Sequence, residues 1–250
     1  MSRTDTELVP VKAGCAGWSV ASGRSDFVEL PGSVLERYAS RLDAVEINIS
    51  FYRPHRRSTY ERWAASTPAQ FRFSVKVPKA ITHTARLKGS EAELAAFLEQ
   101  VSGLGGKLGC LLVQLPPSLD FDAGTAHAFF ENLRSQISVP TVCEPRHSGW
   151  FTPEAEAALT EHQIGRVAAD PAPKRVGEAA AQPGGDPQTA YYRWHGSPRM
   201  YYSAYEPPAL DALATQVRHC TAQDIWVIFD NTAAGAGVGN ALALKEMLQP

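Results

Sequence analysis

Short apolar runs alternate with longer amphipathic runs along almost the whole chain, and this alternation restricts the possible folds more than any other feature. Eight runs are rich in Val, Ile, Cys and aromatic residues, and all but the sixth are followed by a run with helical periodicity, which is typical of βα units around a parallel sheet. The predicted strands are 11–17, 44–49, 71–77, 109–115, 141–144, 165–169, 190–194 and 224–229, and the predicted helices are 31–41, 58–66, 90–104, 123–135, 153–162, 207–219 and 239–248.

Eight such units in 250 residues predict a single α/β domain, a closed (β/α)8 barrel of the TIM type that lacks the helix after its sixth strand. An open doubly wound sheet usually carries a G-x-G-x-x-G turn after its first strand, and no such turn follows residues 11–17. We expect residues 1–10 to form a flexible tail and residues 11–250 to form the barrel.

Charge and cysteine usage indicate the surroundings of the protein. With 24 Lys and Arg against 26 Asp and Glu, no global positive field attracts nucleic acid or a membrane, so a polyanion would have to be met locally. Four cysteines without a C-x-x-C pair indicate reduced thiols. The start resembles no signal peptide and no apolar run reaches the ~20 residues of a membrane span. We expect a cytoplasmic protein without membrane contact, and the sequence indicates no protein partner.

Period-two alternation within each strand predicts which side chains face the barrel interior. In the second strand Glu46 and Asn48 share the face opposite the apolar Val45 and Ile47. Because barrel enzymes carry their active sites at the carboxyl ends of the strands, polar residues facing inward there define a candidate site. The polar residues predicted to face inward are Glu46, Asn48, Arg72, Ser74, Lys76, Gln114, Glu144, Arg146, Arg166, Asp170, Arg193, His195 and Asp230.

Several short motifs in this order resemble the YecE-like family, a domain of unknown function. They comprise Gly14 to Trp18, Val45 to Asn48 with Phe51 and Tyr52, Phe73 to Lys76 with Thr82 and His83, Leu112 to Pro117, Glu144 to His147 with Trp150, Arg193 to Gly196 with Tyr202 and Tyr205, and Phe229 to Asn231 with Asn240 and Ala241. The resemblance covers nearly the whole chain. It implies a TIM-type barrel and no established activity. The chain departs from the family pattern at Ile49, Pro145 and Asp230.

The predicted catalytic residues are Glu46, Lys76, Glu144 and His195. The two glutamates could act as acid and base, or as nucleophile and acid on a sugar, while Lys76 could form a Schiff base and His195 could donate a proton. The alternative is structural: each carboxylate pairs with a nearby Arg or Lys, and Lys76 pairs with Glu46 on the neighbouring strand.

The predicted ligand-binding residues supply positive charge, stacking faces and polar contacts. Glycines after the eighth strand, including Gly237, could present amide N–H groups to an anion. The full set is Trp18, Asn48, Tyr52, His83, Gln114, Arg146, His147, Trp150, Asp170, Arg193, Tyr202, Tyr205, Asp230, Asn231, Gly237 and Asn240. No cofactor motif is present and no metal ligands are assigned, although His83, His147 and His195, with Glu46, Glu144 or Asp170, keep a divalent metal as an alternative.

Three functional hypotheses remain open. The first is an enzyme, a hydrolase, lyase or isomerase, acting on a phosphorylated, sugar-like or nucleotide-like molecule. The second is a non-catalytic barrel that binds single-stranded nucleic acid or a nucleotide through a basic and aromatic rim. The third is a scaffold whose polar ring is purely structural. Sequence alone leaves even the presence of enzymatic activity open.

Overall fold

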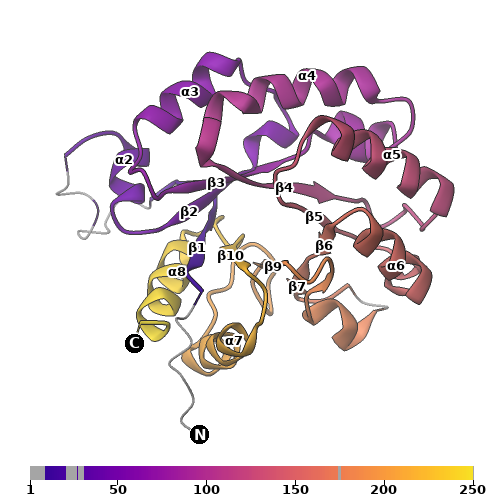
Figure 1. Ribbon diagram of the computed structural model, residues 1–250. Coiled ribbons are helices and arrows are strands. Elements are labelled where there is room, and N and C mark those ends of the chain that lie inside the picture. The colour runs from indigo at the N-terminus through magenta and orange to yellow at the C-terminus, as the bar shows by residue number, and fades with distance from the viewer. Residues whose placement is uncertain (1–8, 21–26, 28–30, 174–175, 250) are drawn as a thin grey trace, which may run out of the picture.

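The computed structural model describes residues 9–20, 27, 31–173 and 176–249, and it is a barrel of parallel strands surrounded by helices (Figure 1). The strands are β1 (Val11–Ala16), β2 (Ala44–Ile47), β3 (Arg72–Lys76), β4 (Leu108–Gln114), β5 (Thr141–Glu144), β6 (Ile164–Arg166), β7 (Ala168–Asp170), β9 (Thr189–Trp194) and β10 (Asp224–Phe229). The first five strands and β6 pair in parallel in chain order, β7 pairs with β9, β9 with β10, and the last strand pairs with the first. This arrangement confirms the predicted (β/α)8 class.

The sixth barrel position is occupied by two short strands that meet at Val167. β6 pairs with β5 on one side, and β7 pairs with β9 on the other. The Val167 amide donates to the carbonyl of Cys143 at 2.9 Å, so this stretch links the two neighbours and closes the barrel. A two-residue strand, β8 (Gly184–Gly185), adds to β6 in the antiparallel direction.

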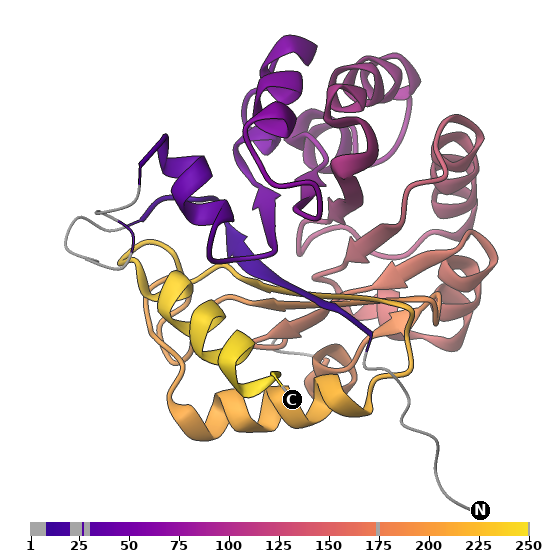
Figure 2. The ribbon, with the colours of Figure 1, turned by 60° about the vertical axis from the view of Figure 1, so that its left-hand side comes forward.

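Seven α-helices of the described residues cover the outside of the barrel, and Figure 2 shows α8 (Ala236–Met247) running along β1 and β10. Side-chain oxygens of Ser33, Asp122 and Thr152 cap the starts of three of them. Between β7 and β9 the described residues contain a 3₁₀ segment, Gly177–Ala181, and no α-helix, as predicted. The helices are α2 (Val34–Ala39), α3 (Arg57–Ala65), α4 (Glu91–Val101), α5 (Ala123–Gln136), α6 (Pro153–Glu161), α7 (Pro207–His219) and α8 (Ala236–Met247).

Short helical turns connect several of these elements. A π-helical turn follows β3, and 3₁₀ turns follow β2 and β5 and precede β4. They are η1 (Ile49–Phe51), η2 (Ala80–Thr84), η3 (Ser102–Lys107), η4 (Ser148–Phe151) and η5 (Gly177–Ala181). The first two lie directly after strand ends that carry predicted site residues, so they shape the rim of the barrel.

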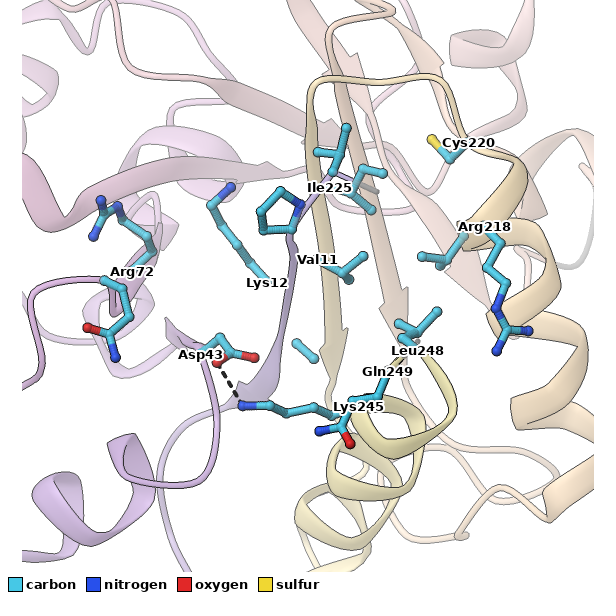
Figure 3. A pocket seen from close by; sticks show the side chains of 15 residues that line it. Val11, Lys12, Asp43, Arg72, Arg218, Cys220, Ile225, Lys245, Leu248 and Gln249 are labelled. Carbon is cyan, nitrogen blue, oxygen red and sulfur yellow. Dashed lines mark hydrogen bonds and ion pairs between the residues drawn. The ribbon is translucent and has the colours of Figure 1, made fainter. Parts of the chain in front are cut away.

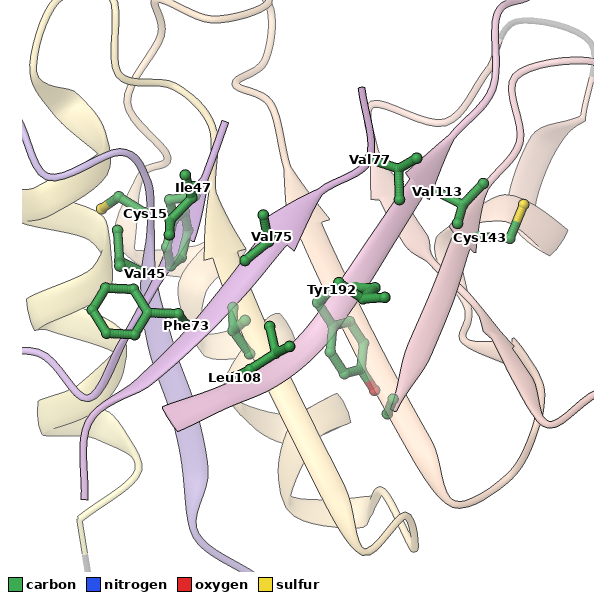
Figure 4. Close-up of a cluster of buried hydrophobic side chains, with 14 of the residues drawn as sticks. Cys15, Val45, Ile47, Phe73, Val75, Val77, Leu108, Val113, Cys143 and Tyr192 are labelled. Atoms are coloured by element: carbon green, nitrogen blue, oxygen red, sulfur yellow. The ribbon is translucent and has the colours of Figure 1, made fainter. Parts of the chain in front are cut away.

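Alternate residues of each strand build two separate apolar layers. The outer layer, between strands and helices, contains Val45, Ile47, Phe73 and Val75 (Figure 4). The inner layer fills the barrel and consists of Ala16, Ala44, Cys110, Leu112, Val142, Val167, Tyr191, Trp226 and Ile228. This apolar layer fills the barrel below the carboxyl ends of the strands, so charges placed above it interact in a medium of low polarity.

The tail predicted at 1–10 stays a prediction, because residues 1–8 lie outside the described part of the structure. Among the residues that are described, no helix has the length and apolar character needed to cross a bilayer.

Candidate functional site at the barrel mouth

The carboxyl ends of β2, β5, β9 and β10 bring acidic and basic side chains together inside the barrel. Glu46, Glu144, Arg193 and His195 are completely buried, and Asp230 is 6% exposed. These residues lie on the inward rows that the alternation predicts for their strands. The predicted convergence of distant charged residues at one mouth is therefore confirmed for this group, which we call the charged ring.

Arg193 is the centre of the charged ring. Its Nε and Nη2 atoms donate to the two carboxylate oxygens of Glu46 at 2.9 and 2.8 Å, a bidentate ion pair. Its Nη1 lies 3.2 Å from Glu144 Oε2, and its Nη2 lies 3.0 Å from Asp230 Oδ2. The hydroxyl of Tyr191 donates to Glu46 Oε2 at 2.9 Å. One guanidinium thus neutralises carboxylates from three strands.

His195 and Arg146 complete the ring on the side of Glu144. The His195 Nε2 atom lies 2.9 Å from Glu144 Oε1, and its Nδ1 lies 3.0 Å from Asp230 Oδ2. Arg146 Nη2 is 2.5 Å from the same Glu144 oxygen. Burial alone would raise the pKa of Glu144, but Arg146, Arg193 and His195 outweigh it and hold that pKa well below the usual range. Glu144 is therefore an ionised carboxylate at neutral pH and has no proton to donate.

Asp230 follows the same logic. Burial opposes its ionisation, and the positive charge of Arg193 together with His195 and Lys76 nevertheless lowers its pKa. In return, the carboxylates of Asp230, Glu46 and Glu144 outweigh the burial of Arg193 and raise its pKa well above the usual range. The charged ring is consequently a network of fixed, mutually compensating charges.

Lys76 ends β3 beside this network but does not join it. Its side chain is 6% exposed, and its Nζ lies 4.2 Å from the centre of the Phe51 ring, a cation–π contact. In the described part of the chain no acceptor forms a hydrogen bond with this Nζ. The expected Lys76–Glu46 pair is wrong, because Glu46 uses both oxygens on Arg193. Burial, reinforced by the charge of Arg193, lowers the pKa of Lys76 to about 8 although three carboxylates oppose this.

A cavity of about 470 Å³ opens above Lys76 at the mouth. The Oδ1 atom of Asn48, on its wall, is buried and has no hydrogen-bond partner among the described residues. Gln114, which also lines the cavity, donates through Nε2 to Glu144 Oε2 at 3.2 Å. The lining residues are Asn48, Phe51, Tyr52, Lys76, Lys79, His83, Gln114, Tyr201, Asp230, Thr232 and Ala233.

His83 lies on the wall of this mouth cavity. Its Nδ1 is 2.9 Å from the hydroxyl of Thr82, and its ring packs edge-on against Phe51. Burial lowers the pKa of His83, and the charges of Lys76, Lys79 and Arg146 lower it further. A neutral imidazole is therefore the dominant form of His83 at pH 7.

Two residues of the sixth strand do not face the mouth. Arg166 was predicted to point inward, yet its Nε pairs with Glu156 of α6 at 3.0 Å and its guanidinium lies over Phe151. Val167 occupies the interior instead. Asp170 accepts a hydrogen bond from the Tyr205 hydroxyl at 2.6 Å and does not line the mouth cavity. The inward row predicted for this strand is wrong because a helix carboxylate stabilises Arg166 on the outside.

Four predicted aromatic and histidine contacts serve packing or local pairing. Trp150 is buried and donates through Nε1 to the carbonyl of Leu119 at 3.1 Å. Trp18 packs edge-on against Trp63, and His147 pairs with Asp120 at 2.9 Å. Tyr205 is buried against Trp194 and donates its hydroxyl to Asp170. The structure places none of these four on the wall of the mouth cavity.

The predicted anion-binding segment after β10 is occupied by internal bonds. Asn240 accepts from the Tyr205 amide at 3.0 Å and donates to the Tyr205 carbonyl at 2.8 Å, while Asn231 donates to Asn240 Oδ1 at 2.9 Å. The Gly237 amide donates to the carbonyl of Asn231 at 3.0 Å. These residues tie the β9–α7 connection to α8 and leave the Gly237 amide engaged within the chain.

Several lining residues were not among the predicted site residues, namely Phe51, Lys79, Thr232 and Ala233. Lys79 follows the end of β3 by three positions. A charged residue so close to a strand that carries site residues could have been predicted from the sequence. Tyr201 is 42% exposed and has a φ of 69°, and neither property is visible in the sequence. Tyr202, which was predicted, is 44% exposed beside it and stacks under the Arg199 guanidinium at 3.9 Å.

The opposite end of the barrel holds a larger cavity of about 700 Å³, shown in Figure 3. It lies where β1 and β10 begin and α7 and α8 end, and its wall includes Lys12, Asp43, Arg72, Arg218 and Lys245. We call this end the base. Lys245 Nζ is 2.8 Å from Asp43 Oδ1.

At the mouth, the described residues provide no set of ligands for the divalent metal that the sequence left as an alternative. In the described residues no three His, Cys, Asp or Glu side chains of the charged ring bring separate ligand atoms close together. The histidines named for it are dispersed, with His195 inside the ring, His83 on the cavity wall and His147 on Asp120.

Comparisons with known proteins agree with this architecture. The family described as "Protein of unknown function DUF72" matches residues 12–250. The chain is 24% identical to the UPF0759 protein YunF of Bacillus subtilis, covering 94% of this chain and 93% of that protein. It is 30% identical to the UPF0759 protein YecE of Escherichia coli K12 over 59% of this chain and 56% of that one. A crystal structure of a DUF72 protein from Thermotoga maritima superposes with a TM-score of 0.76 at 25% identity, covering 96% and 99% of the two chains.

Proposed function

This chain belongs to the DUF72 family, and from that premise we propose that it is an enzyme acting on a small anionic, hydroxyl-bearing molecule of the sugar-phosphate kind, bound in the mouth cavity. The observation that carries the proposal is the Lys76 ammonium, which lies nearly buried at the cavity without a hydrogen-bond acceptor among the described residues. Lys76 lines the cavity without an acceptor for its ammonium in the described part of the chain, and an anionic ligand oxygen supplies one.

Charge and volume support an anionic small molecule. Lys79 lines the same cavity as Lys76, whereas the one acidic residue on its wall, Asp230, is already paired with Arg193 and His195. The unpaired charge that a ligand meets is therefore positive. A cavity of about 470 Å³ suits a small molecule and is too small for a folded partner.

Hydroxyl recognition is assigned to Asn48 and the surrounding rings. The buried Asn48 Oδ1 lacks a donor among the described residues, and a ligand hydroxyl provides one. Phe51, Tyr52 and Tyr201 offer aromatic faces on the same wall, which favour the C–H face of a sugar ring. An anion at one end and hydroxyls at the other match a sugar phosphate.

The reaction that fits these residues is a proton transfer by Lys76. Its pKa of about 8 allows the ammonium that holds a ligand oxygen to give up a proton near physiological pH, which suits a general acid. Arg193 forms ion pairs with both Glu46 and Glu144. In this proposal the two carboxylates therefore orient the site and do not act as an acid–base pair. The proposal therefore assigns lyase or isomerase chemistry ahead of glycoside hydrolysis.

Isothermal titration with inorganic phosphate, ribose 5-phosphate and ribose tests the binding. We expect saturable binding of the phosphorylated sugar, weaker binding of phosphate and the weakest binding of ribose. Lys76→Met should weaken sugar-phosphate binding by about tenfold or more, the loss of one charge-assisted contact. Lys245→Met at the base is the matched control and should bind normally. Equal affinity in both variants, or no saturable binding of any phosphorylated sugar in a wider panel, contradicts the proposal.

A second candidate function is supported by the rim of the cavity. Of the five large hydrophobic side chains that are exposed among the described residues, four lie on the connections after β2 and β9: Ile49, Tyr52, Tyr201 and Tyr202. Exposed tyrosines next to Arg199 and Lys79 provide stacking faces and positive charge for the bases and phosphates of single-stranded nucleic acid.

Fluorescence anisotropy with oligothymidylates of increasing length separates the two candidates. A nucleic-acid binder gains affinity with length, loses affinity as salt rises, and is impaired by Tyr202→Ala. A sugar-phosphate enzyme shows no such length dependence, and Tyr202→Ala leaves its ligand affinity unchanged, because Tyr202 does not line the cavity.

A further inference from the structure

A separate cluster of nitrogen and oxygen ligands lies on the outside of the barrel, where α5 packs beside α6. His127 comes from α5, Glu161 is the last residue of α6 and His162 follows it. His127 Nδ1 is 2.9 Å from His162 Nε2 and 3.9 Å from Glu161 Oε2. One ligand atom from each of the three residues lies within 4.8 Å of the other two.

The two imidazoles are held in place by regular structure. His127 lies within the first half of α5, and the amide of His162 donates to the Ala158 carbonyl at 3.3 Å. Arg134, two turns after His127 on the same helix, donates through Nε to the His162 carbonyl at 2.9 Å and through Nη2 to the Gln163 carbonyl at 2.6 Å. The Arg134 guanidinium therefore fixes the end of α6 against α5, and the ring nitrogens meet without help from an ion.

We propose that His127, Glu161 and His162 bind a Zn²⁺ ion that joins α5 to α6. A tetrahedral zinc ion with bonds of about 2.0–2.1 Å separates its ligand atoms by roughly 3.4 Å, between the two distances seen here. Two imidazoles and a carboxylate suit zinc, whereas magnesium and calcium prefer oxygen ligands alone. The fourth position goes to water. This proposal does not depend on the function assigned to the mouth.

Zinc binding requires one proton to move within one of the two imidazole rings. Without a metal, one imidazole N–H donates to the other ring in the Nδ1···Nε2 contact. On zinc binding, that proton moves to the outer nitrogen of its own ring, and both rings coordinate as neutral ligands.

Accessibility also fits an ion that enters from solvent. The side chains of His127 and Glu161 are 40% and 68% exposed, so Glu161 is free to rotate toward the two rings. Glu131, one turn after His127, adds a second negative charge close enough to act on His162. The positive charge of Arg134 opposes the ion, but its guanidinium is directed to backbone carbonyls.

Isothermal titration with ZnCl₂ tests the site on the full-length protein, with MgCl₂ as the comparison ion. We expect one zinc per chain and no saturable magnesium binding. His127→Gln and His162→Gln should each weaken zinc binding by more than the roughly 10- to 100-fold loss that a missing outer-sphere partner causes. The control is His219→Gln, which changes an exposed histidine on α7 and should bind zinc normally.

Cobalt substitution provides a second readout. Co²⁺ bound by this set should give the intense visible absorption of tetrahedral coordination, and His127→Gln should abolish it. Circular dichroism of each variant shows whether it is folded. The proposal is overturned if folded His127→Gln or His162→Gln binds zinc like the unaltered protein, or if the unaltered protein shows no saturable zinc binding.

Discussion

The two ends of the barrel both carry a cavity and several cations, yet they differ in how those cations are satisfied. At the base, Lys12 pairs with Asp224 and lies over Trp226, and Lys245 pairs with Asp43 (Figure 3). Arg72 donates to the Ala69 and Phe71 carbonyls, and Arg218 donates to the Met247 carbonyl. At the mouth, Lys76 has no such acceptor among the described residues.

This difference teaches that hydrogen-bond satisfaction separates the two ends better than cavity size or number of charges. The base cavity is larger, about 700 Å³ against about 470 Å³, but its cations are occupied. The mouth is smaller, and among the described residues it contains a lysine ammonium with no hydrogen-bond acceptor, Lys76, and a buried amide oxygen with no donor, that of Asn48. A polar ligand completes bonds at the mouth and competes with existing ones at the base.

The largest expected difference between the two ends is in their ion pairs. Arg193→Met should lower the free energy of unfolding by about 3–5 kcal/mol, because the buried carboxylates of Glu46, Glu144 and Asp230 lose the guanidinium that they share. Lys12→Met at the base should cost about 1 kcal/mol or less, since that pair is 26% and 18% exposed. Urea unfolding measures both.

If Arg193→Met does not fold, Arg193→Lys gives the same test in a milder form. This variant keeps the positive charge and loses the bidentate contact. Its loss of unfolding free energy should therefore be larger than that of Lys12→Met and smaller than the loss expected for Arg193→Met. Equal losses for the mouth and base variants would remove the distinction between the two ends.

The next effect is a pH dependence that comes from Lys76. The unfolded lysine keeps its proton up to about pH 10.5, whereas the folded one releases it near its pKa of about 8. Between these values the unfolded chain binds more protons, so stability rises with pH, and the unfavourable term is fully present below pH 8. We expect a gain of at most ~3 kcal/mol from pH 8 to 10.5 that Lys76→Met lacks. Parallel stability curves for the two proteins would contradict it.

A smaller effect is expected from the inner hydroxyl of β9. Tyr191→Phe removes a donor to Glu46 and a contact with Ser74 Oγ at 3.0 Å, and should cost about 1–2 kcal/mol. Tyr192→Phe is the matched control, because its hydroxyl faces Cys220 near the base and sulfur is a weak partner. Guanidinium unfolding should show that Tyr191→Phe is the less stable variant. The reverse order would contradict the idea that the hydroxyl on the inner face of β9 contributes more to stability than the one on its outer face.

The smallest effect is expected for the exposed pair at the base. Lys245 and Asp43 are 32% and 38% exposed, so a double-mutant cycle with Lys245→Met and Asp43→Asn should give a coupling below about 1 kcal/mol that declines with added salt. A larger coupling, insensitive to salt, would make the base resemble the mouth.

The barrel and most of its charged ring could be predicted because the strand patterns are clear. In β2 and β3 the apolar row is continuous, so Glu46 and Lys76 had one possible facing. The sixth strand has small Ala residues on both faces, which left Arg166 and Asp170 to indicate its facing, and Arg166 misled because Glu156 of α6 is its partner. Alternation thus indicates facing only where one row is distinctly apolar.

Pairing within the ring could not be predicted. The sequence places two glutamates and several cations at the same level, but which cation each glutamate contacts depends on side-chain reach and strand register. Arg193 holds both Glu46 and Glu144, and Lys76 is left unpaired as a result. Loop aromatics failed for a similar reason, since Trp150 bonds to a carbonyl 31 residues away that no local pattern indicates.

The position of Arg193 late in the chain has a consequence for synthesis. It follows Glu46 by 147 residues and Glu144 by 49. A nascent chain leaving the ribosome therefore presents both carboxylates well before the guanidinium they share has been made. Until then water must solvate the two carboxylates. The interior at the level of the charged ring can therefore exclude water only after β9, the seventh barrel strand, has been added.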